Sequence, residues 1–196
     1  MSQLTPQILL RAYAAGIFPM AESRDDPKLY WIDPEMRGLL PLEKFHVPTK
    51  LRRAVRQNAF EVRCNTAFLD VMRGCAEATE TRPNTWINAE IVSLYEDLYA
   101  MGHAHSVECW RHNEVAGGIY GVAIGGLFAG ESMFYRASNA SKIALYHLIQ
   151  HVRERGFVLF DIQMLTPVTR RLGGTEISRA EYLRRLARAI ECPCTF

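Results

Sequence analysis

The chain has 196 residues, 48% of them hydrophobic, which is enough to bury a core as one domain with an appendage or as two small ones. Lys and Arg (23) nearly balance Asp and Glu (21), and a formal net charge of +2 excludes a polycation that binds nucleic acid over its whole surface. No apolar run approaches the ~20 residues of a membrane span, and five cysteines without C-x-x-C spacing favour reduced thiols over disulfides or a zinc site. We therefore expect a cytoplasmic protein with no membrane segment and no bound metal.

The first third of the chain predicts two helices with an aromatic segment between them. A Thr-Pro pair opens the first helix, which ends before Gly16. Residues 18–41 are rich in Pro, Asp and aromatic residues and predict an irregular but packed segment, in which Tyr30 and Trp31 are too large to be left exposed. The second helix, residues 50–56, is basic and carries Lys50, Arg52, Arg53 and Arg56.

The rest of the chain alternates strands and helices. We expect strands at residues 60–63, 105–111, 114–122 and 126–134, and helices at residues 68–78 and 87–101. A helix capped by Ser138 follows over residues 140–155, then an apolar strand from residue 157 to 163, a short helix and a last helix over residues 179–190. An antiparallel meander followed by alternating helices and strands is typical of α+β or mixed α/β folds.

The apolar strand ends with two polar residues. Asp161 and Gln163 are two positions apart, so an extended chain presents them on one face, with Phe160 on the opposite face. Burying a carboxylate beside an amide costs several kcal/mol, roughly, unless both are hydrogen-bonded. Taken alone, this stretch slightly favours a strand that runs out into a polar loop.

Four blocks of sequence together point to one family. They are TWIN (85–88), GHAHSVECW (102–110), GGIYGVAIGGLFAGESMFYRASNASKIAL (117–145) and FDIQMLT (160–166). In order and spacing they resemble the leucyl/phenylalanyl-tRNA–protein transferases, and the resemblance covers nearly the whole chain. It implies an α+β fold with a small N-terminal domain, residues 1–35, and a GNAT-like (N-acetyltransferase-type) mixed-sheet domain, residues 36–196.

The resemblance also implies an activity. Enzymes of this family move Leu or Phe, and by extension Met, from an aminoacyl-tRNA to the α-amino group of proteins that begin with Lys or Arg. The new N-terminus is a degradation signal of the N-degron type. The expected partners are therefore aminoacyl-tRNA and such proteins, and no cofactor or metal is implied.

By the same resemblance, Gln163 lies nearest to the scissile ester, and Asp161 is the charge that orients and polarises it. Glu131, in the GES block, would hold the amine of the aminoacyl group. An apolar pocket for the acyl side chain is implied at Ile119, Met133, Leu145, Leu148 and Phe160. Because Phe160 faces away from Asp161, a shared site requires a bulge or a substrate that crosses the strand end.

Further positions concern the tRNA and the acceptor. Trp110 and Phe128 map to aromatic positions around the terminal adenosine, and Met20 replaces the Trp that is usual in the family. The acceptor pocket needs acidic or carbonyl oxygens, for which Glu108 and Glu131 are candidates. The basic residues Lys50, Arg52, Arg53 and Arg56 suit an acceptor stem, but a solvated helix face explains them equally well.

Two alternatives keep part of this interpretation. An acyl-CoA-dependent N-acetyltransferase needs a glycine loop that opens a helix and binds pyrophosphate, and the nearest match, residues 170–175, fails at its last glycine. A non-catalytic module that binds tRNA or protein N-termini has no use for Asp161 and Gln163 beside an apolar pocket.

Overall fold

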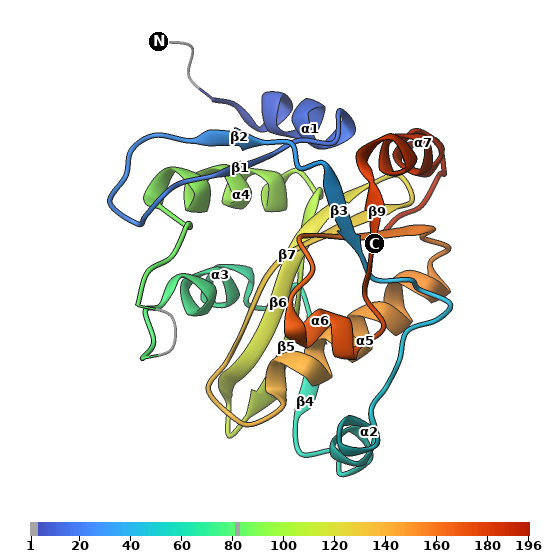
Figure 1. Ribbon diagram of the computed structural model, residues 1–196. Helices are drawn as coiled ribbons and strands as arrows, with labels where there is room; N and C mark the ends of the chain where they lie inside the picture. The colour runs from blue at the N-terminus through green and yellow to red at the C-terminus, as the bar shows by residue number, and fades with distance from the viewer. Residues whose placement is uncertain (1–3, 81–82) are drawn as a thin grey trace.

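The computed structural model describes residues 4–80 and 83–196 (Figure 1). Its strands are β1 (Phe18–Met20), β2 (Tyr30–Ile32), β3 (Met36–Leu39), β4 (Glu61–Cys64), β5 (Ala104–Arg111), β6 (Glu114–Ile124), β7 (Leu127–Tyr135), β8 (Leu159–Gln163) and β9 (Thr175–Ser178). Its helices are α1 (Pro6–Ala14), α2 (Thr49–Arg56), α3 (Phe68–Ala76), α4 (Ala89–Ala100), α5 (Ala140–Glu154), α6 (Pro167–Arg171) and α7 (Arg179–Ile190).

One mixed sheet of seven strands forms the centre, in the order β4-β5-β6-β7-β8-β3-β9. Neighbouring strands are antiparallel from β4 to β7, β7 and β8 are parallel, and β3 is antiparallel to both β8 and β9. The parallel pair is joined by α5, as a parallel crossover requires. The predicted α+β class with a mixed sheet is confirmed.

Helices cover both faces of this sheet (Figure 1). Strand alternation directs Phe128 and Phe160 toward α5, in a core cluster that also contains Leu145 and Leu148. On the opposite face, α3 packs on β6 and β7, α4 packs on β5, and α1 packs on α4. The C-terminal helix α7 lies on that second face too, where its Tyr182 packs with residues of β3, β7 and β8. Two apolar layers therefore enclose the central strands.

The N-terminal segment packs into the same core as the sheet. α1 begins with Thr5, whose hydroxyl accepts from the Ile8 N–H, as the sequence predicted. Residues 18–41 contain β1, β2 and β3 where an irregular segment was expected. The predicted burial of Tyr30 and Trp31 is wrong, since they are 40% and 42% exposed. Among the described residues their strand, β2, pairs only with β1 in a two-stranded sheet, apart from the central one, so its outer edge has no partner strand.

Three local features differ from what the sequence predicted: the cap of α5 and the strands β3 and β9. α5 is preceded by Asn139 in the left-handed conformation, with no side-chain cap, so Ser138 is not its cap. β3 and β9 were not predicted, because each has four residues and a weak pattern of its own. β3 forms its hydrogen bonds with β8 and β9, which are both remote from it in sequence, and β9 pairs with β3.

Candidate functional site

The β6–β7 pair contains a bulge at the centre of the sheet. Tyr120 pairs with Ser132 and Gly121 pairs with Gly130, so Glu131 is the extra residue on β7. A bulged residue leaves the regular ladder and its side chain is re-aimed.

β8 has a bulge of its own at Ile162, because Leu39 of β3 pairs with Asp161 and Gly38 pairs with Gln163. A bulge is therefore present on the strand of Phe160 and Asp161, where a shared site required a bulge or a substrate that crosses the strand end.

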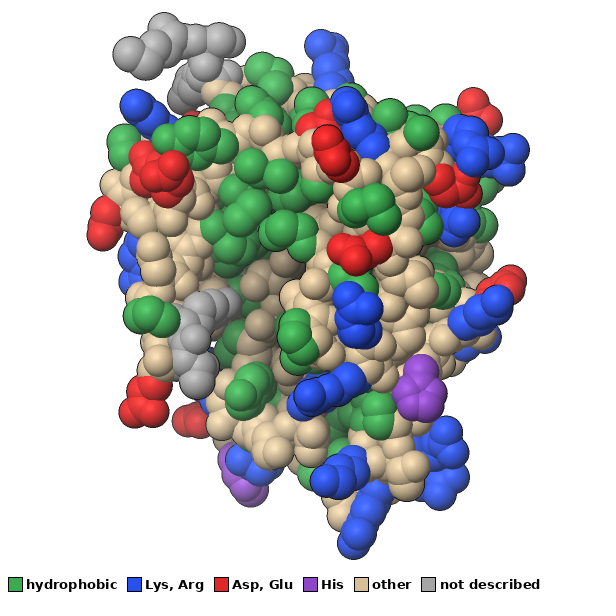
Figure 2. Space-filling model, viewed as in Figure 1, with side chains coloured by type: hydrophobic (Ala, Val, Ile, Leu, Met, Phe, Trp, Pro, Cys, Tyr) green, Lys and Arg blue, Asp and Glu red, His purple; other side chains and the backbone are tan. Residues whose placement is uncertain are grey.

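The parallel strands β7 and β8 separate beside this bulge. Their last paired residues are Ala129 and Asp161. Beyond them lies an apolar cavity of about 230 Å³ against α5, and its wall contains Gln163 and Glu131 together with the predicted Ile119, Met133, Leu145 and Phe160. Figure 2 shows a hollow on this face that hydrophobic side chains border.

A second cavity of about 210 Å³ lies between Glu131 and Gln163 on one side and strand β1 on the other. Phe18 and Met20 of β1 and the half-buried Trp86 form its walls, and Glu131 and Gln163 line this cavity as well. Glu131, Gln163 and Thr166 are therefore the polar side chains shared by an apolar cavity and an aromatic one.

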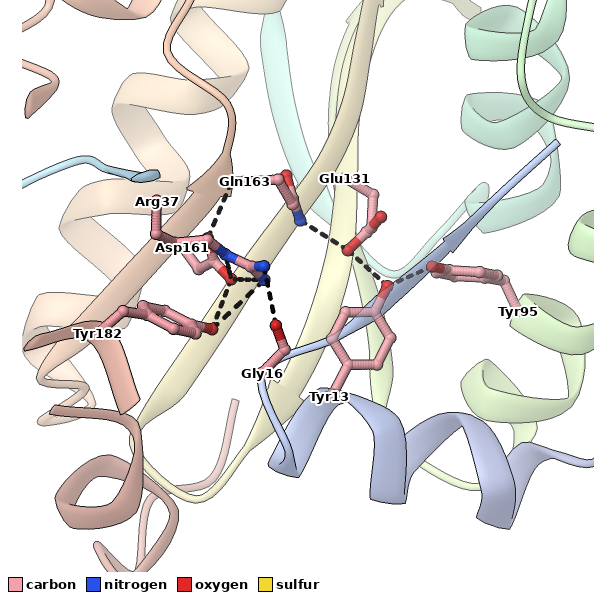
Figure 3. Close-up of polar contacts among 8 residues, drawn as sticks. All are labelled: Tyr13, Gly16, Arg37, Tyr95, Glu131, Asp161, Gln163 and Tyr182. Atoms are coloured by element: carbon pink, nitrogen blue, oxygen red, sulfur yellow. Dashed lines mark hydrogen bonds and ion pairs between the residues drawn. The ribbon is translucent and has the colours of Figure 1, made fainter. Parts of the chain in front are cut away.

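Asp161 is fully buried and forms an ion pair with Arg37 of β3. The Arg37 Nε and Nη2 donate to Oδ1 at 2.9 Å and to Oδ2 at 2.6 Å, and the Tyr182 hydroxyl of α7 donates to Oδ2 at 2.7 Å. Arg37 is 1% exposed, and its Nη1 donates to the Gly16 carbonyl at 2.9 Å (Figure 3). The network thus joins β3, β8, α7 and the loop after α1.

The Asp161 carboxylate also fixes the main chain of Gln163. The Gln163 N–H donates to Asp161 Oδ1 at 2.8 Å, which is the turn that an Asp forms with the residue two positions later. Gln163 has a φ of 53°, and the Met164 N–H donates to the Ile162 carbonyl at 2.5 Å across it. A non-glycine residue in this region is strained by about 1–3 kcal/mol, and the surrounding bonds hold it there.

The side chain of Gln163 binds Glu131 and not Asp161. Its Nε2 donates to Glu131 Oε1 at 2.9 Å, and the Tyr13 hydroxyl donates to the same oxygen at 2.6 Å. The Tyr13 hydroxyl is in turn hydrogen-bonded to that of Tyr95 (Figure 3). The expected polarisation of the Gln163 amide by Asp161 is absent from this geometry, because Asp161 reaches Gln163 only through the main chain.

Glu131 has the perturbed titration of a site residue. Its pKa is raised to about 7, because burial raises it by more than the Tyr13 hydrogen bond lowers it, and the nearby Asp161 charge adds to the rise. Burial raises the pKa of the Tyr13 hydroxyl well above its ordinary value, so that group stays a donor. A carboxyl group with a pKa near neutrality can both accept and return a proton.

Three predicted substrate residues lie outside both cavities. Leu148 is 1% exposed in the core beneath α5. Phe128 is completely buried and stacked on Phe160, with ring centroids 5.3 Å apart, so it offers no free face to a base. Trp110, on β5, lines a separate surface groove with Phe60 and His147.

Glu108 also lines neither of the two cavities. It is completely buried and accepts from the hydroxyls of Ser106 and Thr66 at 2.5 and 2.8 Å. The prediction that Glu108 contacts an acceptor is therefore wrong, because its oxygens are taken up by these two hydroxyls.

The basic helix α2 lies at the far end of the molecule from α1 (Figure 1). Its Leu51 is buried against the core, and its basic side chains point outward, along the lower edge where Figure 2 shows Lys and Arg gathered. The exposed members are Lys50, Arg52, Arg53 and Arg56.

Sequence reasoning missed five residues of this site: Tyr13, Arg37, Trp86, Tyr95 and Tyr182. Arg37 had a usable signal, since it is a single charge within the apolar stretch Met36–Leu40. Trp86 stood inside one of the family blocks without a role. The three tyrosines occur at regular positions of helices and carried no local signal that separates them from core residues.

Within residues 4–80 and 83–196, no group of three or more His, Cys, Asp or Glu side chains is arranged to hold a metal ion. Among these residues no helix is both long and apolar enough to cross a membrane.

Family models match almost the whole chain. The model "Leucyl/phenylalanyl-tRNA protein transferase" matches residues 39–187, and the model of that protein's N-terminal domain matches residues 2–35. The chain belongs to the leucyl/phenylalanyl-tRNA–protein transferase family. It is accordingly an enzyme, an aminoacyl-tRNA–protein transferase, and it acts on aminoacyl-tRNA and protein substrates.

Curated relatives agree with the family. A leucyl/phenylalanyl-tRNA–protein transferase of Paramagnetospirillum magneticum is 55% identical over 97% of this chain and 91% of its own length. One of Nitrobacter winogradskyi is 53% identical over 97% of this chain and 84% of its own.

Solved structures show more distant likeness. The structure of L-PGS from Bacillus licheniformis has a TM-score of 0.49 at 14% identity and covers 94% of this chain and 76% of that one. A ribosomal-protein-alanine N-acetyltransferase of Brucella melitensis has a TM-score of 0.39 at 14% identity, covering 58% of this chain and 87% of that one.

Proposed function

We propose that this transferase moves Leu, Phe or Met from an aminoacyl-tRNA to the α-amino group of proteins that begin with Lys or Arg, in the cytoplasm. The product is a degradation signal of the N-degron type. Family membership supports the donor, and five free cysteines suit a reducing compartment. The observation that carries the proposal is the position of Gln163 and Glu131 between an apolar cavity and an aromatic one.

The apolar cavity receives the acyl side chain. Ile119, Leu145 and Phe160 are held in the core by α5 and form rigid walls. Met133 is only partly buried at the cavity, and its flexible thioether adapts to an aliphatic or an aromatic side chain. A pocket of this kind selects by size and apolarity, which Leu, Phe and Met share.

The aromatic cavity receives the terminal adenosine. Trp86 is the half-buried aromatic side chain of its wall, and stacking of a base on such a ring is worth about 1–3 kcal/mol. Met20 supplies a second, softer wall. We assign to Trp86 the stacking that the resemblance had placed on Trp110 and Phe128.

The reacting groups meet between the cavities. The ester carbonyl lies at Gln163, whose amide donates a hydrogen bond to it or to the incoming amine, and Asp161 holds Gln163 in place through its main chain. Glu131 faces the amines of the aminoacyl group and of the acceptor. Aminolysis of an ester is downhill, so positioning and proton transfer are what the site has to supply.

One incubation tests the proposal. The purified chain is mixed with leucyl-tRNA and with peptides that differ only in beginning with Arg, Lys or Ala, and acetyl-CoA replaces leucyl-tRNA in a parallel series. We expect leucine on the Arg and Lys peptides only. Acetylation in place of leucylation, or equal leucylation of all three peptides, contradicts it.

A further inference from the structure

Three side chains near the reaction centre are candidates to take the proton of the attacking amine. Two are excluded, one by its contacts and one by its chemistry. The Asp161 carboxylate is 0% exposed and lines neither cavity. Its oxygens accept from Arg37, from Tyr182 and from the main chain of Gln163, so no direction is left for a substrate. Asp161 therefore acts as a positioning residue.

Gln163 is excluded by its chemistry. A neutral amide is a very weak base, and its Nε2 is a donor in this structure, directed at Glu131. It can bind the ester or the amine but has no site that holds a proton at neutral pH.

Glu131 is the carboxylate that lines both cavities. Tyr13 and Gln163 both donate to Oε1, which fixes the orientation of the carboxylate from two sides. The bulge on β7 places this side chain where the acyl group and the adenosine meet.

We propose that Glu131 is the proton acceptor of the transfer reaction, with Oε2 directed at the substrate. The inference rests on the function proposed above and adds the base of its chemical step. The neutral acceptor amine attacks the ester carbonyl, and the new N–C bond leaves an extra proton on nitrogen. That proton moves to the Glu131 carboxylate. When the C–O bond to the ribose breaks, Glu131 returns the proton to the ribose oxygen and is a carboxylate again.

The elements packed around Glu131 each place a polar or charged group near its carboxylate. Tyr13 of α1 donates to it, and Tyr95 of α4 supports Tyr13. From β8, Asp161 contributes a negative charge, which Arg37 of β3 counteracts. Burial raises the pKa of Glu131 to about 7, which matches a group that exchanges a proton during turnover at neutral pH.

The first test is Glu131→Gln, which keeps the shape and removes the basic oxygen. Single-turnover transfer from leucyl-tRNA to saturating Arg-peptide is followed from pH 5.5 to 8.5, roughly, and leucyl-tRNA binding is measured separately. We expect the rate to fall by about 10²-fold or more, with binding little changed. In the pH–rate profile, the limb that reports titration of Glu131 in the wild type should disappear. The limb that reports titration of the acceptor amine, near pH 8, should stay. Glu114→Gln, an exposed carboxylate on β6, is the matched control.

The second test is Tyr13→Phe, which leaves the carboxylate but removes its donor. The Tyr13 hydrogen bond lowers the pKa of Glu131, so its loss should move the Glu131 limb to higher pH while the amine limb stays. A merely structural role of Glu131 predicts no such shift. If Glu131→Gln does not fold, the pH at which the Glu131 limb lies in Tyr13→Phe tests the inference by itself.

The outcomes are distinct. A rate within threefold of wild type in folded Glu131→Gln, or an unmoved limb in Tyr13→Phe, overturns the inference and leaves the proposed function standing. Absence of leucine transfer by the wild-type chain overturns the proposed function itself.

Discussion

The Asp161 carboxylate serves the proposed site through its hydrogen bonds to other residues. It accepts hydrogen bonds from Arg37, Tyr182 and the main chain of Gln163 in a fully buried position. A buried charge pair adds little net stability, but removing one partner is costly because the other charge stays buried. Its contribution is geometric, since it holds Gln163 at a strained main-chain angle.

Asp161→Asn tests this reading. The change leaves the Arg37 guanidinium without a counter-charge, so we expect a loss of about 3–5 kcal/mol in the free energy of unfolding. Turnover should fall on the order of 10²-fold, while leucyl-tRNA binding survives. Denaturant unfolding and single-turnover kinetics measure the two effects.

The double variant Arg37→Met with Asp161→Asn tests whether Asp161 acts only by positioning Gln163. It removes the unpaired charge, and the new amide oxygen can still accept from the Gln163 N–H. We expect most of the lost stability and a measurable part of the turnover to return. A folded but fully inactive double variant contradicts a positioning role.

Gln163 offers a second test, because its φ of 53° is costly for any residue with a Cβ. Gln163→Ala and Gln163→Gly both remove the amide, and both should lose most of the turnover. The glycine variant should be more stable than the alanine variant by about 1 kcal/mol, since glycine adopts this angle freely. Equal unfolding free energies of the two variants would show that the angle relaxes without the side chain.

At the scale of elements, the acyl cavity depends on how β7, β8 and α5 meet. Met133→Ala removes a flexible wall of the cavity. We expect kcat/KM for leucyl-tRNA to fall by about 10–200-fold, the range for 1–3 kcal/mol of lost pocket contact. Steady-state kinetics with leucyl- and phenylalanyl-tRNA measure the effect.

Leu148→Ala is the matched control for the cavity. Leu148 lies on the same helix as Leu145 but in the core, away from the cavity wall. Its truncation should cost about 2–5 kcal/mol in stability and leave the Leu-to-Phe preference unchanged. A changed preference would mean that the cavity extends further than its present walls.

The basic helix α2 makes a separate prediction. If it contacts the acceptor stem, Arg52→Gln with Arg53→Gln removes two phosphate contacts. The KM for charged tRNA should rise, its salt slope should flatten by about 1.4–1.8 in log–log units, and kcat should change little. A wild-type KM and salt slope would identify α2 as a solvated face only.

At the scale of the whole molecule, the site joins segments that are far apart in the chain. Arg37 connects β8 to the loop after α1, and Tyr13 of α1 reaches Glu131 on β7. The N-terminal segment therefore supplies part of the polar network of the site and also part of the second cavity, through Met20.

This arrangement makes stability depend on pH. The pKa of Glu131 is raised from 4.5 to about 7, so its carboxyl form favours the folded state. The stabilisation is fully present below pH 4.5, roughly, and is lost as the pH rises through about 7. Glu131→Gln removes this dependence, so the variant should gain stability relative to wild type between pH 5 and 8, approximately, in thermal unfolding scans. A constant difference across that range contradicts the raised pKa.

The sequence by itself determined the elements and the family. Helical and strand periodicity depends on neighbours two to four positions away, and it located most of the helices and the strands β4 to β8. The strand with Asp161 and Gln163 was recognisable for the same reason. The family blocks then predicted an acyl pocket at Ile119, Met133 and Phe160, and these three residues line one cavity.

Tertiary structure alone decided the polar partners. Asp161 meets Arg37 from 124 positions away, and Tyr13 meets Glu131 from 118, and no local pattern encodes either contact. The same limit explains why Phe128 was expected beside a base: alternation gives its face, but only the packing of α5 shows that this face is core. Side chains that are remote in sequence are brought together by the burial of whole elements, and the site depends on those contacts.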